Sequence, residues 1–356
     1  TPAVIDRMFD RPRLLNGLSR FSASTSAADL GALTVSVLEG EKGRQRKELN
    51  KLVDWLAGDF KPDLVQLPNS LFLGFARELK RRLGVPVLCA LQGEDLFVDG
   101  LIEPYKSQVL HLLRQRAADV DGFVAPCAYY SDYMARLLEV PAERVHVVHL
   151  GIALQGYGDP AGKTEGTFNI GYLARICPEK GLHLLIDAFI DLRARLEGAH
   201  PTLAIAGYLG GADRGYFQDL MSKVQERGLQ EAVVYKGEVT REEKIAFLQR
   251  LDVLSVPTTY ADPKGLFVLE SWAAGVPVAQ PRHGAFPELI AATGGGMLVD
   301  PDSASSVAEA LAELAEDPQR RQELGSAGKR AVRDRFDDAT MARNTLAVYK
   351  HYSAKE

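Results

Sequence analysis

The residues best suited to chemistry lie in one stretch of the second half of the chain, residues 255–278. There an apolar run leads into a polar loop, then into Gly265 and a helix predicted to start at Leu266. The free backbone N–H groups and the dipole at the start of a helix favour a phosphate group. The amides of Gly265 and Leu266 are therefore candidates for binding a phosphorylated ligand.

Two carboxylates accompany this helix start. Glu270 follows Leu266 by four residues, so the two lie on the same side of the helix, about one turn apart. An ionised glutamate can accept two hydrogen bonds, which suits the vicinal diol of a ribose. Asp262, in the loop, is placed to accept hydrogen bonds from the hydroxyl groups of a sugar. The alternative for Glu270 is a solvated helix carboxylate without a ligand.

Two cations, Arg175 and Lys180, bracket a turn at the end of another predicted strand. Arginine binds phosphate oxygens through a planar fork, and lysine binds them as a point charge. Together they would neutralise the negative charge that builds on a diphosphate leaving group. Either residue alone is also common on protein surfaces, so the prediction depends on both lying near Gly265.

An alternation of short apolar runs and longer amphipathic stretches must position these side chains. In the first half it predicts strands at 64–68, 85–91, 122–126 and 145–150, and helices at 71–83, 104–118 and 129–138. In the second half it predicts strands at 168–172, 202–206, 233–236, 253–256 and 277–279, and helices at 181–196, 216–227, 242–251, 266–274 and from about 303 onward. This alternation indicates βαβ units, so the expected fold class is α/β with two doubly wound, Rossmann-like domains.

The expected domains are residues 1–153 and 168–335, with a Gly-rich linker around 151–167 and a terminal helix at 336–356. Ligands of open parallel sheets bind beyond the carboxyl ends of the strands, so two such domains facing each other would hold the active site in the cleft between them. The segment up to about Asn50 is helical in tendency and lacks the strand and Gly-rich turn that open a nucleotide-binding fold. We therefore expect the first elements of the amino-terminal domain to be missing.

Composition and charge limit the classes of partner. The 356 residues suffice for two domains, and no apolar run approaches the roughly 20 residues that span a bilayer. The formal net charge of −5 provides no basic field for nucleic acid. Cys89, Cys127 and Cys177 are far apart and lack metal-ligand spacing, so we expect buried thiols in a reducing compartment. Residues 1–10 lack the features of a signal peptide, which favours a cytoplasmic location.

These segments resemble the retaining glycosyltransferases of family GT4, which have the two-domain GT-B fold. The family's Gly-Arg-Leu…Lys-Gly pattern is similar to residues 171–181, although Tyr172 and Ala174 intervene before Arg175. Its two glutamates separated by seven residues fall on Asp262 and Glu270. Its Glu-Ala-Met-Ala-x-Gly-x-Pro-Val and Gly-Gly-x-Pro-Glu patterns resemble residues 270–278 and 283–288. The resemblance covers roughly residues 64–352, is stronger in the second half, and implies that the last helix crosses back onto the first domain.

The resemblance implies a role for each of these residues. Arg175 and Lys180 would hold the diphosphate and Glu270 the ribose. Asp262, which replaces the family's first glutamate, would contact the transferred sugar, and the shorter side chain would change the choice of sugar or weaken the grip. The backbone of Gly237–Val239 would contact the base.

Other residues are weaker candidates. Gln92 stands at the end of a first-domain strand where the family often has histidine, and glutamine can hydrogen-bond but cannot titrate. Gln92 and Asp95 are therefore candidates for contacting the sugar or the acceptor, with a purely structural turn as an equal alternative. His283 lies in a loop near the expected donor site. Pro287 and Glu288 are expected to start and cap a helix, and the family pattern keeps Glu288 as a minor donor-site candidate.

The function implied by the resemblance is transfer of a hexose from a UDP- or GDP-sugar to an acceptor hydroxyl. No metal or other cofactor is expected, because protein cations and a helix N-terminus would take the charge. A saccharide or lipid-linked acceptor fits, the latter with peripheral membrane contact. One alternative is a GT-B nucleotide-sugar 2-epimerase, which needs acid and base side chains in the cleft and is disfavoured by Gln92. The other is a non-catalytic, glycosyltransferase-like binding protein.

Overall fold

The computed structural model describes residues 27–158, 167–196 and 200–353. Two predicted segments lie partly outside these residues: the amino-terminal segment before residue 27 and the linker at residues 159–166. The expectation that the first elements of the amino-terminal domain are missing concerns the first of them. The chain divides into two compact units, Thr1–Phe123 with Ala135–Arg144, and Val124–Met134 with Val145–Glu356. The predicted domain boundaries and the predicted cleft stay predictions.

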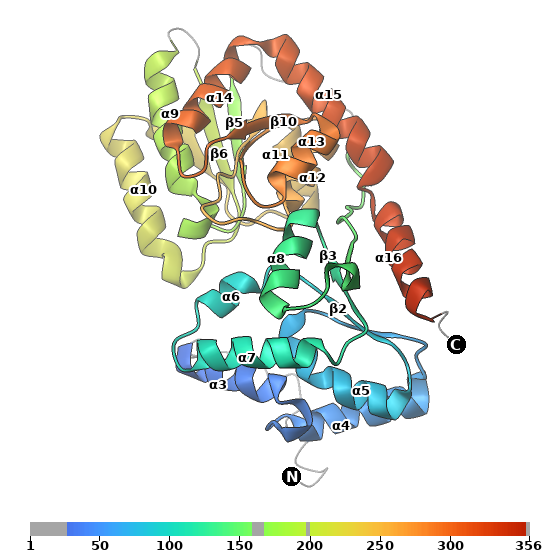
Figure 1. Cartoon of the computed structure of the whole chain (residues 1–356). Helices are drawn as coiled ribbons and strands as arrows, with labels where there is room; N and C mark the ends of the chain where they lie inside the picture. The colour runs from blue at the N-terminus through green and yellow to red at the C-terminus, as the bar shows by residue number, and fades with distance from the viewer. Residues whose placement is uncertain (1–26, 159–166, 197–199, 354–356) are drawn as a thin grey trace. The chain divides into compact units, whose positions relative to one another are not determined.

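The first sheet has four strands in the order β1-β2-β3-β4. They are β1 (Val65–Leu67), β2 (Val87–Ala90), β3 (Gly122–Ala125) and β4 (Val145–Val147). Figure 1 labels β2 and β3 of this sheet. β1 and β2 are parallel, and every residue of β2 is buried, as expected for a strand covered on both faces. The helices of the first unit are α3 (Ala27–Leu38), α4 (Arg46–Trp55), α5 (Ala76–Leu83), α6 (Asp95–Asp99) and α7 (Tyr105–Ala117). The next helix, α8 (Ala128–Leu138), begins in the second unit, which contains Val124–Met134.

Two details of this half differ from the predicted pattern. The helix predicted at 71–83 begins as a 3₁₀ helix, η4 (Ser70–Phe75), and becomes α-helical only in α5. Gly74 allows η4 to lie close to the end of α3, because a Cβ atom at this position would lie 2.3 Å from the carbonyl oxygen of Val37. The short helix α6 was not predicted. The helices α3 and α7 are joined through Arg116, whose buried guanidinium donates to the carbonyl oxygens of Leu38 and Glu39 at 3.0 and 2.7 Å.

The second sheet has six strands in the order β10-β9-β8-β5-β6-β7. They are β5 (Asn169–Leu173), β6 (Thr202–Ala206), β7 (Val233–Tyr235), β8 (Val253–Leu254), β9 (Val278–Pro281) and β10 (Gly296–Val299), and the neighbouring strands run parallel. β10 was not predicted from the sequence. It is a four-residue run opened by Gly296, where a Cβ atom would lie 2.3 Å from the carbonyl oxygen of Val278 in the adjacent strand.

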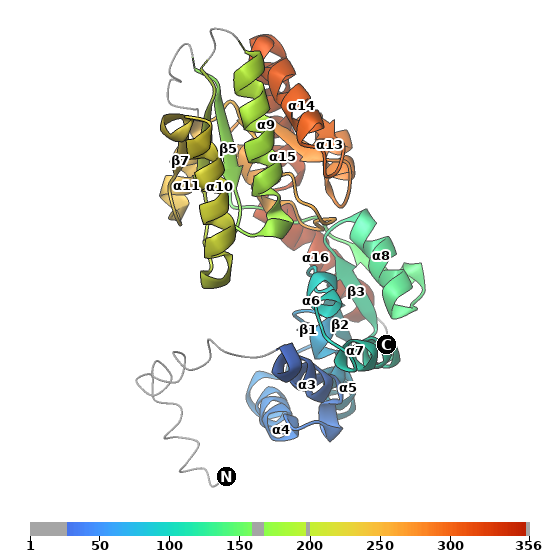
Figure 2. The ribbon, with the colours of Figure 1, turned by 90° about the vertical axis from the view of Figure 1, so that its left-hand side faces the viewer.

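Helices cover both faces of this sheet (Figure 2). α9 (Leu182–Arg195) packs against α10 (Arg214–Glu226) and α14 (Ala304–Glu316), whereas α12 (Leu266–Ala273) packs against α11 (Arg241–Gln249) and α15 (Pro318–Arg335). α13 (Phe286–Thr293) and the terminal α16 (Asp338–Ser353) complete the chain. The strand order and the helices confirm the predicted α/β class with two parallel sheets.

The centre of the second half is Trp272 on α12, which is fully buried. Its indole Nε1 donates to the carbonyl oxygen of Gly295 at 2.7 Å. A Cβ atom at Gly328 of α15 would lie 2.3 Å from the indole ring, so glycine lets α15 approach closely. Packing around Trp272 therefore fixes the position of α12, the helix that carries the candidate site.

The three cysteines are free thiols and all are buried, as predicted. Among the described residues, no helix is both long and apolar enough to cross a membrane.

Candidate active site

The start of α12 is organised by Asp262. Gly265 adopts a left-handed conformation, φ 59°, immediately before the helix. The Asp262 Oδ1 atom accepts hydrogen bonds from the backbone N–H groups of Lys264 and Gly265 at 2.9 and 3.3 Å. The amide of Gly265, a predicted phosphate contact, therefore already has a partner in this structure. Leu266 follows as the first residue of the helix, and its side chain is exposed.

The other oxygen of Asp262 meets a lysine and a tyrosine. Lys180 Nζ donates to Asp262 Oδ2 and to the Tyr260 hydroxyl, at 2.6 Å in each case, and that hydroxyl donates to Oδ2 at 3.1 Å. Asp262 is only 4% exposed, and burial alone would raise its pKa. The positive charge of Lys180 and the hydrogen bonds outweigh this and hold the pKa below its ordinary value. Burial and the nearby Asp262 charge raise the pKa of Tyr260.

The turn that carries Lys180 fits closely against the loop after β8. Gly181 has φ 70°, and a Cβ atom there would lie 1.8 Å from the carbonyl oxygen of Pro257. The Thr259 N–H donates to the carbonyl oxygen of Glu179 at 3.0 Å. β5 and β8 are adjacent in the sheet, so their carboxyl ends bring this turn and this loop together. The sequence prediction that Lys180 lies near the α12 start is therefore confirmed in geometry.

Arg175 lies on the same turn, immediately beyond β5. Its side chain is exposed, and its Nε donates to the buried sulfur of Cys177 at 3.4 Å. The hydroxyl of Tyr172 donates to the Arg175 carbonyl oxygen at 3.1 Å and holds the backbone there. Arg175 is therefore accessible at the carboxyl end of β5, and its proposed contact with a diphosphate stays a prediction.

Glu270 is not a solvated helix carboxylate. Its Oε1 atom accepts from Nζ of Lys244, on α11, at 2.5 Å, and the Glu270 side chain is only 18% exposed. Lys244 was not predicted as a site residue from the sequence. The signal available was a lysine in the predicted helix at 242–251, which by itself resembles any surface lysine.

The loop that contains His283 holds the backbone of Asp262 in place. The Ala285 N–H donates to the Asp262 carbonyl oxygen at 2.9 Å, and Gly284 (φ 61°) allows the close approach. Nε2 of His283 lies 2.9 Å from the carbonyl oxygen of Thr258. Since a carbonyl can only accept, this nitrogen carries a proton and donates. His283 therefore supports the loop in this structure, and its contact with a donor stays a prediction.

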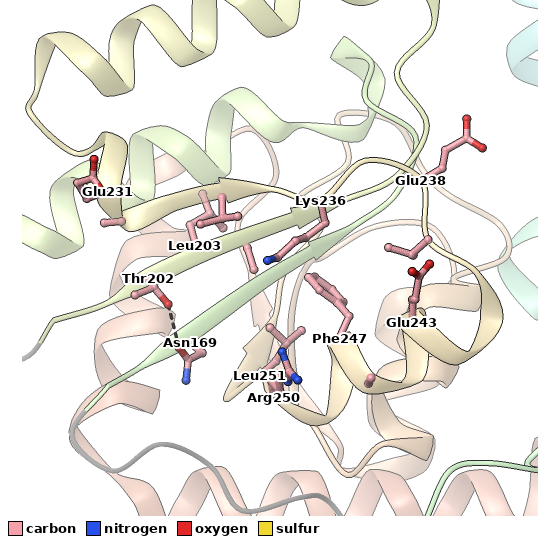
Figure 3. Close-up of a pocket in the computed structure, with 15 residues that line it drawn as sticks. Asn169, Thr202, Leu203, Glu231, Lys236, Glu238, Glu243, Phe247, Arg250 and Leu251 are labelled. Atoms are coloured by element: carbon pink, nitrogen blue, oxygen red, sulfur yellow. Dashed lines mark hydrogen bonds between the residues drawn. The ribbon is translucent and has the colours of Figure 1, made fainter.

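The predicted base contact, Val239, lines a groove of about 880 Å³ between α11 and the strands β6 and β7 (Figure 3). The groove extends from Thr202 and Glu231 at one end to Glu238 and Glu243 at the other. Lys180, Asp262 and Glu270 do not line it. This groove therefore meets the predicted site at Glu238 and Val239, within the predicted base contact.

Glu288 lies in the first turn of α13, which begins around Pro287 as predicted. Its carboxylate accepts from the N–H groups of Ala128 and Tyr129, at 3.0 and 3.1 Å, and contacts His149 Nε2 at 3.3 Å. Burial opposes ionisation, but these hydrogen bonds hold the pKa of Glu288 below its ordinary value. Glu288 therefore satisfies the free amides at the start of α8, not those of its own helix.

Gln92 and Asp95 belong to the other compact unit, and their part in any site stays a prediction. The buried carboxylate of Glu94, which was not predicted from the sequence, accepts from the N–H groups of Gln92 and Ser70 at 2.6 and 2.7 Å. An acidic residue in a predicted turn, where backbone N–H groups lack helix or sheet partners, was the sequence feature that could have indicated this role for Glu94. The described residues contain no group of three or more His, Cys, Asp or Glu side chains that could hold a metal ion.

Comparisons with known proteins show which families and folds the chain matches. Residues 159–331 match the family model "Glycosyl transferases group 1", and residues 20–151 match "Glycosyl transferase 4-like domain". The chain is 32% identical over 198 residues to a GDP-mannose-dependent alpha-(1-6)-phosphatidylinositol monomannoside mannosyltransferase of Mycobacterium tuberculosis, covering 52% of this chain and 50% of the relative. It is 26% identical over 296 residues to the glycogen synthase of the same organism, covering 82% and 69%. The chain thus spans about half the length of the first of these relatives.

Solved structures show the same fold. Anabaena HepE in complex with UDP matches with a TM-score of 0.73 and 19% identity, covering 88% of this chain and 84% of that one. A sucrose-phosphate synthase from Thermosynechococcus elongatus matches with a TM-score of 0.71 and 19% identity, covering 88% and 80%. These likenesses confirm the predicted GT-B fold.

Proposed function

We propose that this chain, which belongs to the group 1 glycosyltransferases of family GT4, transfers a hexose from a UDP- or GDP-sugar to an acceptor hydroxyl with retention of configuration. The observation that carries the proposal is the buried Lys180–Asp262 pair at the start of α12, with Glu270 one turn further along the helix. A cation, a helix start and a carboxylate in this order suit the diphosphate and the ribose of one nucleotide.

The leaving diphosphate would be stabilised by Lys180, Arg175 and the amide of Leu266. In the reaction, the bond between the anomeric carbon and the diphosphate oxygen breaks, and its electron pair leaves with the nucleotide. The acceptor oxygen forms the new bond to that carbon, and one proton is released. Lys180 and Arg175 offset the charge that appears on the diphosphate, which is where fixed cations lower the barrier most.

Asp262 has a more constrained role than the sequence suggested. A carboxylate offers about four acceptor positions, and here Lys264, Gly265, Lys180 and Tyr260 supply four donors. A sugar hydroxyl must therefore displace one of them. We propose that Lys180 turns toward the diphosphate when the donor binds, which frees a position on Oδ2 for the sugar.

The names of the relatives are consistent with both candidate bases. The mycobacterial mannosyltransferase uses GDP-mannose and a phosphatidylinositol mannoside by its name, and the Anabaena structure contains UDP. A lipid-linked or saccharide acceptor is proposed for this chain on the same ground.

The test is calorimetric binding of UDP and GDP, without added metal, to the wild type and to Lys180→Ala and Glu270→Ala. A charge-assisted hydrogen bond contributes about 1.5–3 kcal/mol, so each substitution is expected to weaken the preferred nucleotide by about 10- to 100-fold. Lys223→Ala, which breaks an ion pair between α9 and α10, is the control and is expected to bind like the wild type. If the folded wild type binds neither nucleotide, the proposed function is wrong.

Incubation with donor sugars separates the alternatives named from the sequence. A glycosyltransferase releases free nucleoside diphosphate, slowly by hydrolysis and faster when an acceptor is present. Epimerised donor without free diphosphate would instead support the 2-epimerase. Nucleotide binding with no turnover of any donor would support the binding protein.

A further inference from the structure

A second ion pair joins α12 to its neighbour α11. Lys244 Nζ, on α11, lies 2.5 Å from Glu270 Oε1 on α12. The side chains are only 25% and 18% exposed, so water and salt screen this pair less than a surface pair. Lys244 is not among the residues proposed above to contact the donor, although it holds Glu270, which is one of them.

The segment that precedes the second sheet lies near the same carboxylate. Tyr157 is buried, and burial together with the charge of Glu270 raises the pKa of its hydroxyl. The Arg241 guanidinium lies 5.8 Å from the centroid of the Tyr157 ring and donates to the carbonyl oxygens of Ala153 and Gln155 at 2.9 and 2.6 Å. α11 therefore holds both Glu270 and the chain segment beside it.

The hydrogen bond from Lys244 leaves Glu270 able to accept others. It uses one position on Oε1, and a carboxylate offers about four, so positions remain for both hydroxyl groups of a diol. A carboxylate already held in one orientation loses less conformational entropy when a ligand binds. The pair thus prepares Glu270 for a diol without occupying it fully.

We propose that Lys244 is a positioning residue for the ribose of the donor: it fixes the orientation of Glu270, and through it the site selects nucleotides with an intact 2′,3′-diol. This inference rests on the proposed function, because it assumes that a nucleotide binds at α12. Lys244 acts through Glu270 and does not itself touch the ligand.

A merely structural role for Lys244 is the competing explanation. Lys223 and Asp187 form such a pair between α10 and α9, where the side chains are 42% and 39% exposed. Both pairs join neighbouring helices of the same half of the chain, so Lys223→Met is a matched control for Lys244→Met. A structural role would affect every nucleotide equally, whereas a positioning role depends on the diol.

The experiment measures calorimetric affinity for whichever of UDP and GDP the wild type binds, and for its 2′,3′-dideoxy analogue. Lys244→Met is expected to weaken the natural nucleotide about tenfold, equivalent to about 1.4 kcal/mol, and to change the affinity for the dideoxy analogue less than about twofold. In a Glu270→Gln background, Lys244→Met is expected to add no further loss, because the two residues act through one contact. Lys223→Met is expected to leave both affinities unchanged.

The outcomes distinguish this inference from the function on which it rests. If the wild type binds a nucleotide but Lys244→Met weakens the natural and dideoxy forms equally, the inference is wrong and the proposed function stands. Additive losses from Lys244→Met and Glu270→Gln also overturn it. If the folded wild type binds neither nucleotide, both the function and the inference fail. Lys244→Gln, measured beside Lys244→Met with circular dichroism of each, provides a second variant if the methionine variant does not fold.

Discussion

Replacing Asp262 with asparagine should destabilise the second half of the chain by about 3 kcal/mol. The substitution preserves the shape but removes the charge, and it turns an amide N–H₂ group toward Lys180 Nζ or toward the backbone amides of Lys264 and Gly265. Removing one partner of a buried ion pair costs about 3–5 kcal/mol, and the 18% exposure of Lys180 favours the lower end. The Asp262→Asn variant should therefore unfold at a clearly lower urea concentration.

Trp272 provides the assay for this prediction. The chain has two tryptophans, and only Trp272 lies in the half that carries Asp262, where it is fully buried. In a Trp55→Phe background, its fluorescence reports the unfolding of that half alone. With a urea dependence of about 2–3 kcal/mol per molar, a loss of about 3 kcal/mol lowers the midpoint by about 1 M.

The pH dependence of unfolding provides an independent test of whether ionised Asp262 stabilises the folded state. The pKa of Asp262 is lowered in the folded state, so its ionised form contributes stability above its ordinary pKa of 3.8, and this contribution is lost as the pH falls through the folded value. The gap between wild type and Asp262→Asn should be constant at neutral pH and should close in acid. Lys180→Met combined with Asp262→Asn should recover part of the loss, since no unpaired charge remains. A midpoint shift below about 0.2 M at pH 7, or a gap that widens in acid, would refute the reasoning.

Two further predictions concern the elements around the site. Gly181→Ala should displace the turn that carries Lys180, because the new Cβ atom would lie 1.8 Å from the Pro257 carbonyl oxygen, and should weaken nucleotide binding at least about tenfold in calorimetry. Gly228→Ala has a similar φ of 68° but open space around it, so it should cost about 1 kcal/mol of stability and leave binding intact; equal loss in both variants would contradict the steric argument. Glu288→Gln should speed hydrogen exchange of the first amides of α8 about tenfold, because a charged acceptor is lost. The folded pKa of Glu288 is lowered, so this difference should be full above pH 4.5 and shrink as the pH falls, and a difference that grows in acid would contradict it.

The sequence predicted the sheets well because βαβ alternation is a long-range pattern that single residues do not disturb. β6 begins and ends where it was predicted, β3, β4, β7 and β8 begin at the predicted residue, and the other bounds of the predicted strands differ by one to three residues. β10 was missed because its four residues follow two glycines and depend on contact with β9, which no local pattern reports. α6 was missed for a related reason, since five residues after Gly93 are too few to show helical periodicity.

The sequence predicted those residues of the candidate site that are close to one another in the chain. It did not predict the contacts between residues of different helices and strands. The spacing of Asp262, Gly265 and Glu270 follows from one loop and one helix, so the sequence alone placed them together. Lys244 and Glu270 form their ion pair although they are 26 positions apart in the sequence. Tyr260 belongs to the site only through its hydrogen bond with Lys180, which follows β5. Helix packing creates these contacts, and single-sequence periodicity does not record which helices become neighbours.

An aspartate at position 262, where the resemblance to the family predicts glutamate, suits the α12 start. An aspartate oxygen reaches the backbone N–H groups two and three residues further on, which is the geometry that makes Asp a good acceptor at helix starts. A glutamate would have to fix one more side-chain torsion to bind the same amides. The shorter side chain therefore ties Oδ1 to the helix and leaves Oδ2 alone to hold Lys180. One carboxylate thus controls both the helix start and the cation, so a sugar contact by Asp262 depends on Lys180 moving to the diphosphate first.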